Sequence, residues 1–421
     1  MARAGQVKRV VGGSSTVRLT DRISLGVLAE FLPRDVIEDV LVETGRREQR
    51  TRRLPAHVMV RFCVAMCLFF DDDYEEVMRK LVGSLRSMGS WRDDWRVPTT
   101  SAITQARQRL EVEPLRVLFE RTAVPVAGRG TRGAWLGSRR LMVADGFRLD
   151  VPDSVANAEE FGRPTNGERV GAFPQVLTVV LGECGSRAIV GAAFGPCHSD
   201  ERGLAKALVA RLEPNMLVMA DRNFYSFELW GAFRAAGADL LWRVKANLRL
   251  PVLRWLPDGS YLSVIVNPKI TGRRRAQLIR DAESGVAIDP SDGYVVRVVE
   301  YDVPDRDGSG TEEIICVITS VLDPAEATAE ELAAAYHERW EGENLIDELK
   351  THQRGPAKIL RSQSPAMVRQ EIWSFLLAHY GIRKLMCRAA DEIGEDPDRL
   401  SFMRSLRIIR RHVTGQADFS P

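Results

Sequence analysis

The rest of the chain can be organised around one stretch near its C-terminal end, Tyr336-His-Glu-Arg339-Trp-Glu-Gly-Glu343-Asn-Leu-Ile-Asp-Glu-Leu-Lys350. Because an α-helix turns about 100° per residue, side chains spaced three, four and seven residues apart fall within roughly a 60° arc. The four side chains with this spacing are Tyr336, Arg339, Glu343 and Lys350. Leu345 and Leu349 lie on the other side and can anchor the helix to a core. The pattern predicts a site for an anionic ligand that also needs a metal; the alternative is a solvated helix face with i,i+4 ion pairs.

Two upstream segments each end a short apolar run on an aspartate. They are Leu141-Met-Val-Ala-Asp145-Gly146 and Leu217-Val-Met-Ala-Asp221-Arg222. Such a run is typical of a buried strand, so we expect each aspartate at the end of a strand. A single aspartate in this position is usually a turn residue or a helix cap. Two of them together with Glu343 make a set of three carboxylates, and hard oxygen ligands of this kind suit Mg²⁺ or Mn²⁺.

In this order the motifs resemble those of the bacterial insertion-sequence transposases of the DDE type, specifically the insertion-sequence-four family. The signature of that family is Tyr-(2)-Arg-(3)-Glu-(6)-Lys, and residues 336–350 match it without a gap. Further matches are Asp145-Gly146, Val151-Pro-Asp-Ser154 with Asn157 and Phe161-Gly162, and Asp221-Arg-Asn-Phe-Tyr-Ser226. The resemblance extends from about residue 20 to about residue 390 and so covers nearly the whole chain.

The resemblance implies an enzyme that cuts the DNA at the ends of an insertion sequence and joins the freed 3′-hydroxyls to target DNA. Asp145, Asp221 and Glu343 would be its catalytic residues and would hold two Mg²⁺ or Mn²⁺ ions per active site, with Asp145 as the bridging ligand. The residues expected to contact DNA near the cut are Arg339 and Lys350 on phosphates, Arg222, and Tyr336 through a hydrogen bond or base stacking.

The expected partners are double-stranded DNA, at the terminal inverted repeats and at the target, and a second copy of the chain in a homodimer on paired ends. No motif for nucleotide hydrolysis appears, so no nucleotide cofactor is expected. Two other functions use the same features. One is a metal-dependent DNA nuclease without strand transfer. The other is an inactive transposase-derived DNA-binding protein, which the intact triad argues against.

Composition sets broad limits on the type of protein. A length of 421 residues predicts two or three domains, and 45% hydrophobic with 28% charged residues is ordinary for a globular protein. The longest apolar run, residues 62–70, is far shorter than the roughly 20 residues a spanning helix needs, and no signal peptide is evident. We therefore expect no membrane association and a cytoplasmic protein, nucleoid-associated when bound to DNA. The six cysteines show no zinc spacing and are expected to be reduced core residues.

The pattern of elements, together with the resemblance, predicts an α/β protein with a ribonuclease-H-like catalytic core that carries a β-rich insertion. Core strands are expected at 140–147, 175–182, 188–194, 216–220 and 240–244, with helices at 201–212 and 226–236. The expected parts are a helical N-terminal DNA-binding domain (1–135), the core in two pieces (136–243 and 324–390), the β-rich insertion (244–323) and a C-terminal basic helix (391–421).

The N-terminal region reads as helical throughout. Helices are expected after Thr20-Asp21, from Pro33 to Thr44, and over 54–70, 72–81 and 100–110. DNA phosphates are assigned either to Arg107 and Arg109 or to the cluster Arg46-Arg47, Arg50 and Arg52-Arg53. The alternative is a helical lid that only packs on the core.

In the insertion the helical period disappears, and strands are expected at 248–256, 261–266, 294–303 and 314–321. Arg273-Arg-Arg275 would either contact DNA or form a charged sheet edge. After the catalytic helix, Ser364-Pro365 would begin a long helix through Arg388. Residues 400–412 would form a short basic helix with Arg404, Arg407, Arg410 and Arg411, which touches DNA or a second subunit, or is simply solvated.

Some family members free the element through a DNA hairpin, with a tryptophan about thirty residues before the glutamate stacking on a flipped base. The corresponding strand, residues 312–320, contains no aromatic residue. We expect Trp255, Tyr261 or Tyr336 to stack on the base instead, or a different cut of the second strand.

Overall fold

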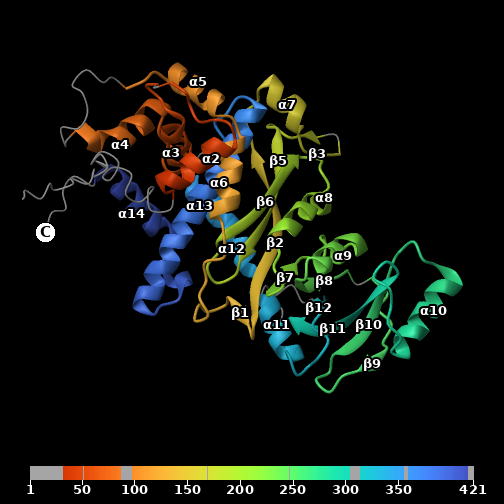
Figure 1. The fold of residues 1–421 in the computed structure, drawn as a ribbon. Coiled ribbons are helices and arrows are strands. Elements are labelled where there is room, and N and C mark those ends of the chain that lie inside the picture. The colour runs from red at the N-terminus through yellow and green to blue at the C-terminus, as the bar shows by residue number, and fades with distance from the viewer. Residues whose placement is uncertain are drawn as a thin grey trace, which may run out of the picture.

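A ten-stranded sheet forms the centre of the molecule, with helices on both of its faces (Figure 1). The computed structural model describes residues 32–50, 52–86, 97–167, 169–245, 247–303, 313–354 and 359–415. The helix expected after Thr20-Asp21 lies outside these residues. In sequence numbering, the strands of the sheet follow the order β6-β5-β2-β7-β8-β12-β11-β10-β9, and β1 pairs with β2.

Five strands form the part of the sheet that carries the catalytic motifs. They are β2 (Arg139–Asp150), β5 (Gln175–Glu183), β6 (Ile189–Pro196), β7 (Met216–Ala220) and β8 (Asp239–Arg243). The first three form an antiparallel meander, while β7 runs parallel to β2 and β8 runs parallel to β7. The connections to β7 and β8 are α8 (Glu201–Ala205) with the 3₁₀ helix η2 (Lys206–Arg211), and α9 (Phe227–Ala235). This arrangement confirms the predicted ribonuclease-H-like core.

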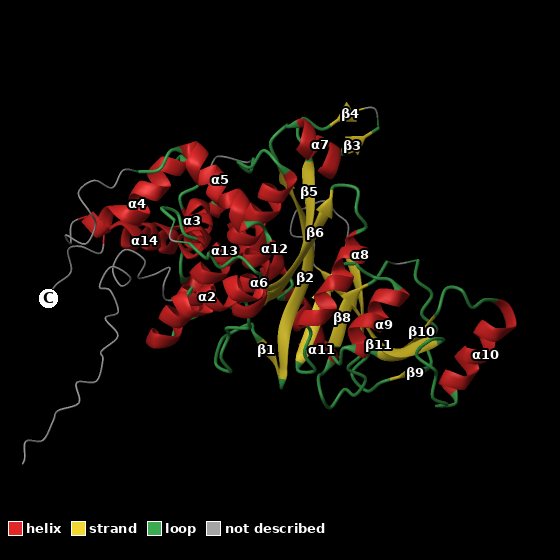
Figure 2. Ribbon diagram, turned by 45° about the horizontal axis from the view of Figure 1, so that its top comes forward, coloured by secondary structure: helices red, strands yellow, loops and turns green. Residues whose placement is uncertain are grey.

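Both faces of this core are covered, as a mixed sheet with crossover helices requires. Alternate residues of β2 point to opposite faces. Met142 and Ala144 pack with residues of α8, η2 and α9, including Trp230. Leu141 and Val143 face the other way, toward the helix α11 (Ala329–His337). Figure 2 shows the sheet between these two layers of helices.

The insertion continues the central sheet. Its strands are β9 (Arg254–Trp255), β10 (Tyr261–Val266), β11 (Gly293–Val303) and β12 (Glu313–Thr319). Because β12 pairs antiparallel with β8, the inserted strands extend the same sheet. The expectation that no helix occurs here is wrong, since α10 (Gly272–Glu283) follows β10 and carries Arg273–Arg275. Leu278 is the one residue buried in α10, so the apolar period that would reveal a helix is missing.

The N-terminal helices pack on the C-terminal part of the chain. They are α2 (Arg34–Glu43), α3 (Ala56–Leu68), α4 (Tyr74–Arg86), α5 (Thr100–Leu110) and α6 (Glu113–Thr122). The 29-residue helix α13 (Pro365–Ile393) contacts α3 and α6 on one side and β6 on the other, and α14 (Phe402–Gly415) packs on α4. One continuous apolar cluster contains buried residues of α2, α3, β2, β5, α13 and α14.

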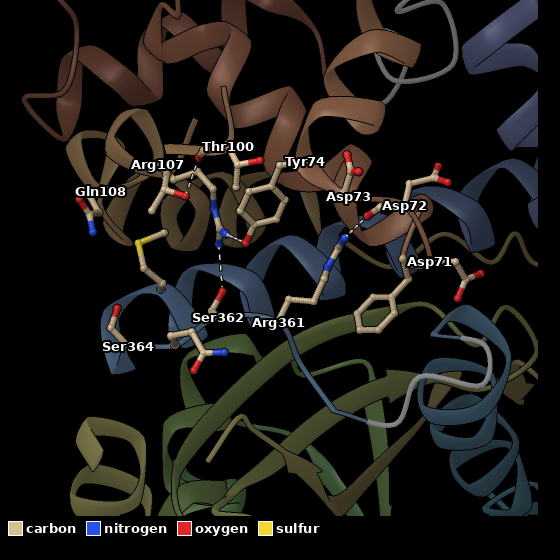
Figure 3. A pocket seen from close by; sticks show the side chains of 14 residues that line it. Asp71, Asp72, Asp73, Tyr74, Thr100, Arg107, Gln108, Arg361, Ser362 and Ser364 are labelled. Carbon is tan, nitrogen blue, oxygen red and sulfur yellow. Dashed lines mark hydrogen bonds between the residues drawn. The ribbon is translucent and has the colours of Figure 1, made fainter. Parts of the chain in front are cut away.

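A polar pocket of about 590 Å³ lies where α4 and α5 meet the beginning of α13 (Figure 3). Arg107 of α5 is only 1% exposed, and its Nε lies 3.0 Å from Oε1 of Gln370. Its two terminal nitrogens donate to the Tyr74 hydroxyl and, over 3.2 Å, to Ser362 Oγ. Arg107 therefore links the N-terminal helices to α13, and its assignment to DNA phosphates is wrong because the side chain is buried and each of its three nitrogens already donates a hydrogen bond within the protein.

No disulfide joins the six cysteines, all of which lie in the described residues; five are buried, as expected for core residues, and Cys316 is half-buried. Among the helices that the structure describes, none combines the length and the apolar surface needed to cross a bilayer.

Candidate active site

The pairing of two parallel strands brings Asp145 and Asp221 together. The last paired residues of β2 and β7 are Ala144 and Ala220, so the two aspartates follow at the same level. Asp221 stands at the end of its strand, as predicted. Asp145 does not, because β2 continues as far as Asp150 through its antiparallel pairing with β5. β7 stops at Ala220, and on that side β2 next pairs at Asp150, through an isolated parallel bridge to Ile359. We call the site beside the unpaired stretch between these two levels, at the carboxyl end of β7, the crevice.

The signature stretch forms three segments, and its prediction as one helix is wrong. Tyr336 lies in α11, Glu343 in α12 (Trp340–Asp347), and Lys350 in the π-helical segment η3 (Glu348–Gln353). At the junction of α11 and α12, the amide of Arg339 donates to the carbonyl of Tyr336 over 3.1 Å. This i→i+3 bond tightens the chain into a 3₁₀ turn, which ends the first helix.

Two glycines allow α12 to approach the sheet closely. A Cβ on Gly342 would lie 2.8 Å from Val143 Cγ2 of β2, and a Cβ on Gly182 of β5 would lie 2.6 Å from Leu345 Cδ1. Leu345 and Leu349 are buried, as predicted. The helix therefore rests directly on the strands that lead to the crevice, and Glu343, the residue after Gly342, is held beside Asp145.

Arg339 links two of the three carboxylates. Its Nη2 lies 2.9 Å from Glu343 Oε1, and its Nη1 lies 3.9 Å from Asp145 Oδ2. Burial raises the pKa of Asp145. The amide of Gly146 and the charge of Arg339 oppose that rise, while the charges of Glu343 and Asp221 add to it. Among the described side chains, the three carboxylates thus carry more formal negative charge than Arg339 alone offsets, which is an environment that favours a bound cation.

The other three residues predicted to contact DNA differ in how exposed they are. Tyr336 is 5% exposed, and its hydroxyl donates to the carbonyl of Ala220 over 3.4 Å, so it supports the strand end that carries Asp221. Its ring is too buried to stack on a base. Arg222 is exposed in the turn after β7. Lys350 is half-buried, and within the described residues its ammonium forms no ion pair with a carboxylate.

Two residues near the crevice were not identified from the sequence. Glu201, the first residue of α8, places its Oε1 1.8 Å from the position that a Cβ on Gly146 would occupy. Burial and the charge of Asp145 raise the pKa of Glu201. Trp340 is 55% exposed, and the centroid of its ring lies 5.7 Å from Cζ of Arg339. The glycine after Asp145 and the tryptophan after Arg339 were the available signals in the sequence.

The candidates for base stacking differ in exposure. Tyr261 is 7% exposed, and its hydroxyl lies 3.1 Å from Glu300 Oε1. Trp255 is 65% exposed and contacts the Tyr261 ring edge-on at 5.1 Å between centroids. Of the three aromatic residues expected to stack on a base, two are buried, and Trp255 alone presents its ring to solvent.

Arginines outside the crevice form two exposed groups. A groove of about 350 Å³ between the α2–α3 loop and the end of α5 is lined by Arg46, Arg47, Arg52 and Arg109. Three of these lie near acidic side chains: Arg46 is 2.5 Å from Glu111, Arg47 is 3.8 Å from Glu38, and Arg52 is 3.6 Å from Glu48. On α14, Arg404, Arg407 and Arg411 are exposed, whereas Arg410 donates to the carbonyl of Leu68 and points back into the protein.

The donor set of the crevice fits a divalent cation, because Asp145, Asp221 and Glu343 supply hard carboxylate oxygens and the site lacks balancing positive charge. In the part of the chain that the structure describes, no three acidic, histidine or cysteine side chains converge closely enough to hold a metal without rearrangement. Arg339 bridges two of the ligands in this arrangement.

Comparison with protein families gives two matches. Residues 22–120 match the model described as "Insertion element 4 transposase N-terminal", and residues 136–380 match the one described as "Transposase DDE domain".

Two similar proteins come from Escherichia coli (strain K12). The transposase InsG for insertion sequence element IS4 is 29% identical over 403 residues, which cover 95% of this chain and 85% of that protein. The putative transposase InsZ is 29% identical over 225 residues, which cover 53% of this chain and 72% of that protein. Among solved structures, the piggyBac transposase synaptic complex with hairpin DNA aligns with a TM-score of 0.47 and 13% identity, over 93% of this chain and 80% of that one.

Proposed function

The chain belongs to the insertion-sequence-four family of DDE transposases, and from that premise we propose that it binds the terminal inverted repeats of an insertion sequence, cleaves the DNA at the element's ends and joins the freed 3′-hydroxyls to target DNA. Membership makes it an enzyme of DNA transposition that depends on divalent metal. The observation that carries the finer proposal is the crevice at the end of β7, where Asp145 and Asp221 follow one parallel pair and Arg339 links Asp145 to Glu343.

We assign Asp145, Asp221 and Glu343 as catalytic residues and metal ligands. Two divalent cations, Mg²⁺ or Mn²⁺, would supply the positive charge that an in-line displacement at phosphorus requires. Arg339 would exchange its carboxylate partners for a phosphate of the bound DNA, because a guanidinium forms paired hydrogen bonds with phosphate as readily as with carboxylate. Lys350 and Arg222 would add phosphate contacts on either side of the cut.

We assign the parts of the chain as follows: residues 1–135 to binding of the element's ends, 136–243 and 324–390 to catalysis, and 244–323 and 391–421 to further contacts. The exposed groove with Arg46, Arg47, Arg52 and Arg109 supports the first assignment, since arginines on a surface bind phosphates with little sequence preference. The exposed arginines of α14 support a role for the C-terminal helix at DNA or at a second subunit. The functional unit would be a homodimer on two paired ends, without a nucleotide cofactor.

The proposal is tested by incubating the purified protein with DNA carrying one end of its element, a plasmid target and Mn²⁺. We expect cleavage at the end, followed by covalent joining of the end to the plasmid, and neither product with Glu343→Gln. Cleaved ends that never join would identify a metal-dependent nuclease. Binding without any cleavage would identify a DNA-binding protein derived from a transposase.

A further inference from the structure

The catalytic helix has a second acidic face behind the one that carries Glu343. Glu341 lies in the first turn of α12, and Glu348 is the residue that caps its C-terminal end and begins η3. They are seven residues apart, which is nearly two helical turns, so they lie on one face. Glu343 follows Glu341 by two residues and therefore points about 200° away from it. The side chains of Glu341 and Glu348 are 10% and 7% exposed, whereas that of Glu343 is 44% exposed.

Arg187 forms ion pairs with both rear carboxylates, those of Glu341 and Glu348. Its Nε and Nη2 contact the two oxygens of Glu341 at 2.5 and 3.0 Å, and its Nη1 lies 2.9 Å from Glu348 Oε1. Because the planar guanidinium carries its donors in a fixed fork, it can bind one carboxylate with two nitrogens and reach a second carboxylate with its third. One side chain thus spans the helix from its first turn to its C-terminal end.

The segment that delivers Arg187 is itself constrained. Arg187 lies in the turn between β5 and β6 and has a φ of 54°, a left-handed conformation that a residue with a Cβ adopts only at a cost. Such conformations persist where surrounding contacts determine them. In the same turn, a Cβ on Gly185 would lie 2.5 Å from the carbonyl oxygen of Arg132, so the turn is packed against the chain before β2.

Further groups fix the cluster to the C-terminal helices. Arg383 and His379 of α13 lie 2.9 and 3.5 Å from Oε2 of Glu348. Asp398, in the short 3₁₀ helix η4 (Pro397–Arg399), lies 3.0 Å from Nη2 of Arg187. The rear face of α12 is therefore tied at once to the β5–β6 turn, to α13 and to η4, through side chains that are largely or fully buried.

We propose that Arg187 is a positioning residue, which sets the rotation of α12 about its axis and so holds Glu343 at the crevice beside Asp145. The proposal rests on the proposed role of Glu343 as a metal ligand. Within the described part of the chain, the carboxylate of Glu343 is ion-paired with Arg339 alone, which leaves its orientation to the helix that carries it. Misplacement of a catalytic group by about 1 Å can cost roughly 100-fold in rate, so control from the rear face is consequential.

A matched control exists on the central strand. Arg139, at the beginning of β2, also contacts two carboxylates, Asp239 at 2.6 Å and Glu326, and its side chain is 16% exposed against 15% for Arg187. It belongs to the opposite end of β2 from the crevice. Arg139→Ala therefore removes a comparably buried guanidinium and its ion pairs without touching α12.

The experiment measures Mn²⁺ binding to the full-length protein without DNA, by electron paramagnetic resonance of the free ion, together with thermal unfolding. We expect Arg187→Ala to weaken Mn²⁺ binding at least tenfold, while Arg139→Ala binds Mn²⁺ as the wild type does, although both lose stability. Wild-type affinity in Arg187→Ala would overturn the proposal and leave Arg187 a purely structural residue.

Two more variants, Arg187→Lys and Glu343→Gln, test the positioning role of Arg187 and the metal-ligand role of Glu343 separately. If Arg187→Ala does not fold, Arg187→Lys tests the proposal instead. The lysine ammonium cannot form a bidentate contact with Glu341 and reach Glu348 at the same time. We expect it to weaken Mn²⁺ binding severalfold, and unchanged binding would contradict the proposal. Glu343→Gln separates the two ideas. Unchanged Mn²⁺ affinity in that variant would refute the proposed metal-ligand role and the positioning idea with it, whereas weak binding there with normal binding in both Arg187 variants refutes the positioning idea alone.

Discussion

The two faces of α12 carry the same kind of side chain under different conditions. On the front, Glu343 is 44% exposed and has one partner, Arg339. On the rear, Glu348 is 7% exposed and lies within ion-pair distance of Arg187, Arg383 and His379. Burial alone would raise the pKa of Glu348, but the neighbouring His379 and the charges of Arg383 and Arg187 lower it overall. The Glu348 carboxylate is thus held ionised as part of the scaffold.

On the front, burial raises the pKa of Asp145, and the charges of Glu343 and Asp221 add to that rise. A site built to bind cations is expected to be unfavourable to folding in their absence, with its support supplied elsewhere. We therefore expect that substitution of a front carboxylate removes activity without loss of stability. Substitution of a rear carboxylate should lower stability, and should lower activity only as far as it disturbs the position of Glu343.

The largest expected effect comes from the front. Asp145→Asn, Asp221→Asn and Glu343→Gln each keep the side-chain shape and remove the charge that holds a cation, so we expect cleavage of end DNA to fall by at least about 1,000-fold. Binding of end DNA, measured by gel shift, should persist. If one of these variants still cut end DNA at close to the wild-type rate, the assignment of the three residues as the catalytic triad would be wrong.

Stability provides a second reading of the Asp145→Asn variant. Because the pKa of Asp145 is raised in the folded state, its contribution to stability is full at low pH and is lost as the pH rises through that pKa. An asparagine cannot ionise and avoids this loss. At pH 7.5 the Tm of the metal-free variant should therefore equal or exceed that of the wild type, and a clear decrease would mean that Asp145 is a scaffold residue.

The next largest effect is expected on stability, from substitution of a carboxylate on the rear face of α12. Glu348→Gln leaves Arg383, which is fully buried, with only the longer 3.9 Å contact to Asp398, and breaking a buried ion pair in this way costs about 3–5 kcal/mol. Urea unfolding should show a loss of this order. A loss below about 0.5 kcal/mol, as exposed pairs show, would contradict the contrast between the two faces.

A smaller effect is expected at an aromatic ring that faces outward. If the hairpin route operates, Trp255 is the exposed ring among the expected stacking residues, and stacking of one base contributes roughly 1–3 kcal/mol. Trp255→Ala should lower the yield of hairpin ends on a denaturing gel. The matched variant Tyr261→Phe, which loses only a buried hydroxyl contact, should not. If Trp255→Ala formed hairpins at the wild-type level, a role of Trp255 in base stacking would be excluded.

The smallest effect is expected at the N-terminal groove, where two arginines of one helix can be compared. Arg109 is exposed, whereas Arg107 is buried against α13. Arg109→Ala should reduce the slope of log affinity against log salt for end DNA by about 0.9, the value for one phosphate contact. Arg107→Ala should lower the Tm and leave the slope unchanged. The reverse pattern would show that Arg107 reaches DNA.

Much of the core could be predicted from local patterns. The apolar runs before Asp145 and Asp221 predicted their strands, and the order of elements together with the resemblance predicted the ribonuclease-H-like core that contains them. The position of Asp145 within its strand was wrong because the pairing of β2 with β5 extends it to Asp150, which no apolar run announces. The single catalytic helix was wrong because a 3₁₀ turn at Arg339 and a π-helical segment at Lys350 interrupt it.

The remaining errors and omissions concern contacts between distant parts of the chain. Arg107 is buried by Gln370, which is 263 residues away, and the partners of Arg187 in α12 follow it by 154 and 161 residues. An arginine in a helix or a turn has the same local pattern whether it faces solvent or a later helix. The helix α10 was missed for the opposite reason, since it buries only Leu278 and has almost no apolar face.

The central claim is that the front of α12 performs the reaction while its rear holds the fold. The most direct test measures Tm and Mn²⁺-dependent joining of end DNA on the same preparations of Glu343→Gln and Glu348→Gln. The account predicts no joining at wild-type Tm for Glu343→Gln, and a lowered Tm with detectable joining at low temperature for Glu348→Gln. Detectable joining by Glu343→Gln, together with a complete loss of joining by a fully stable Glu348→Gln, would contradict it.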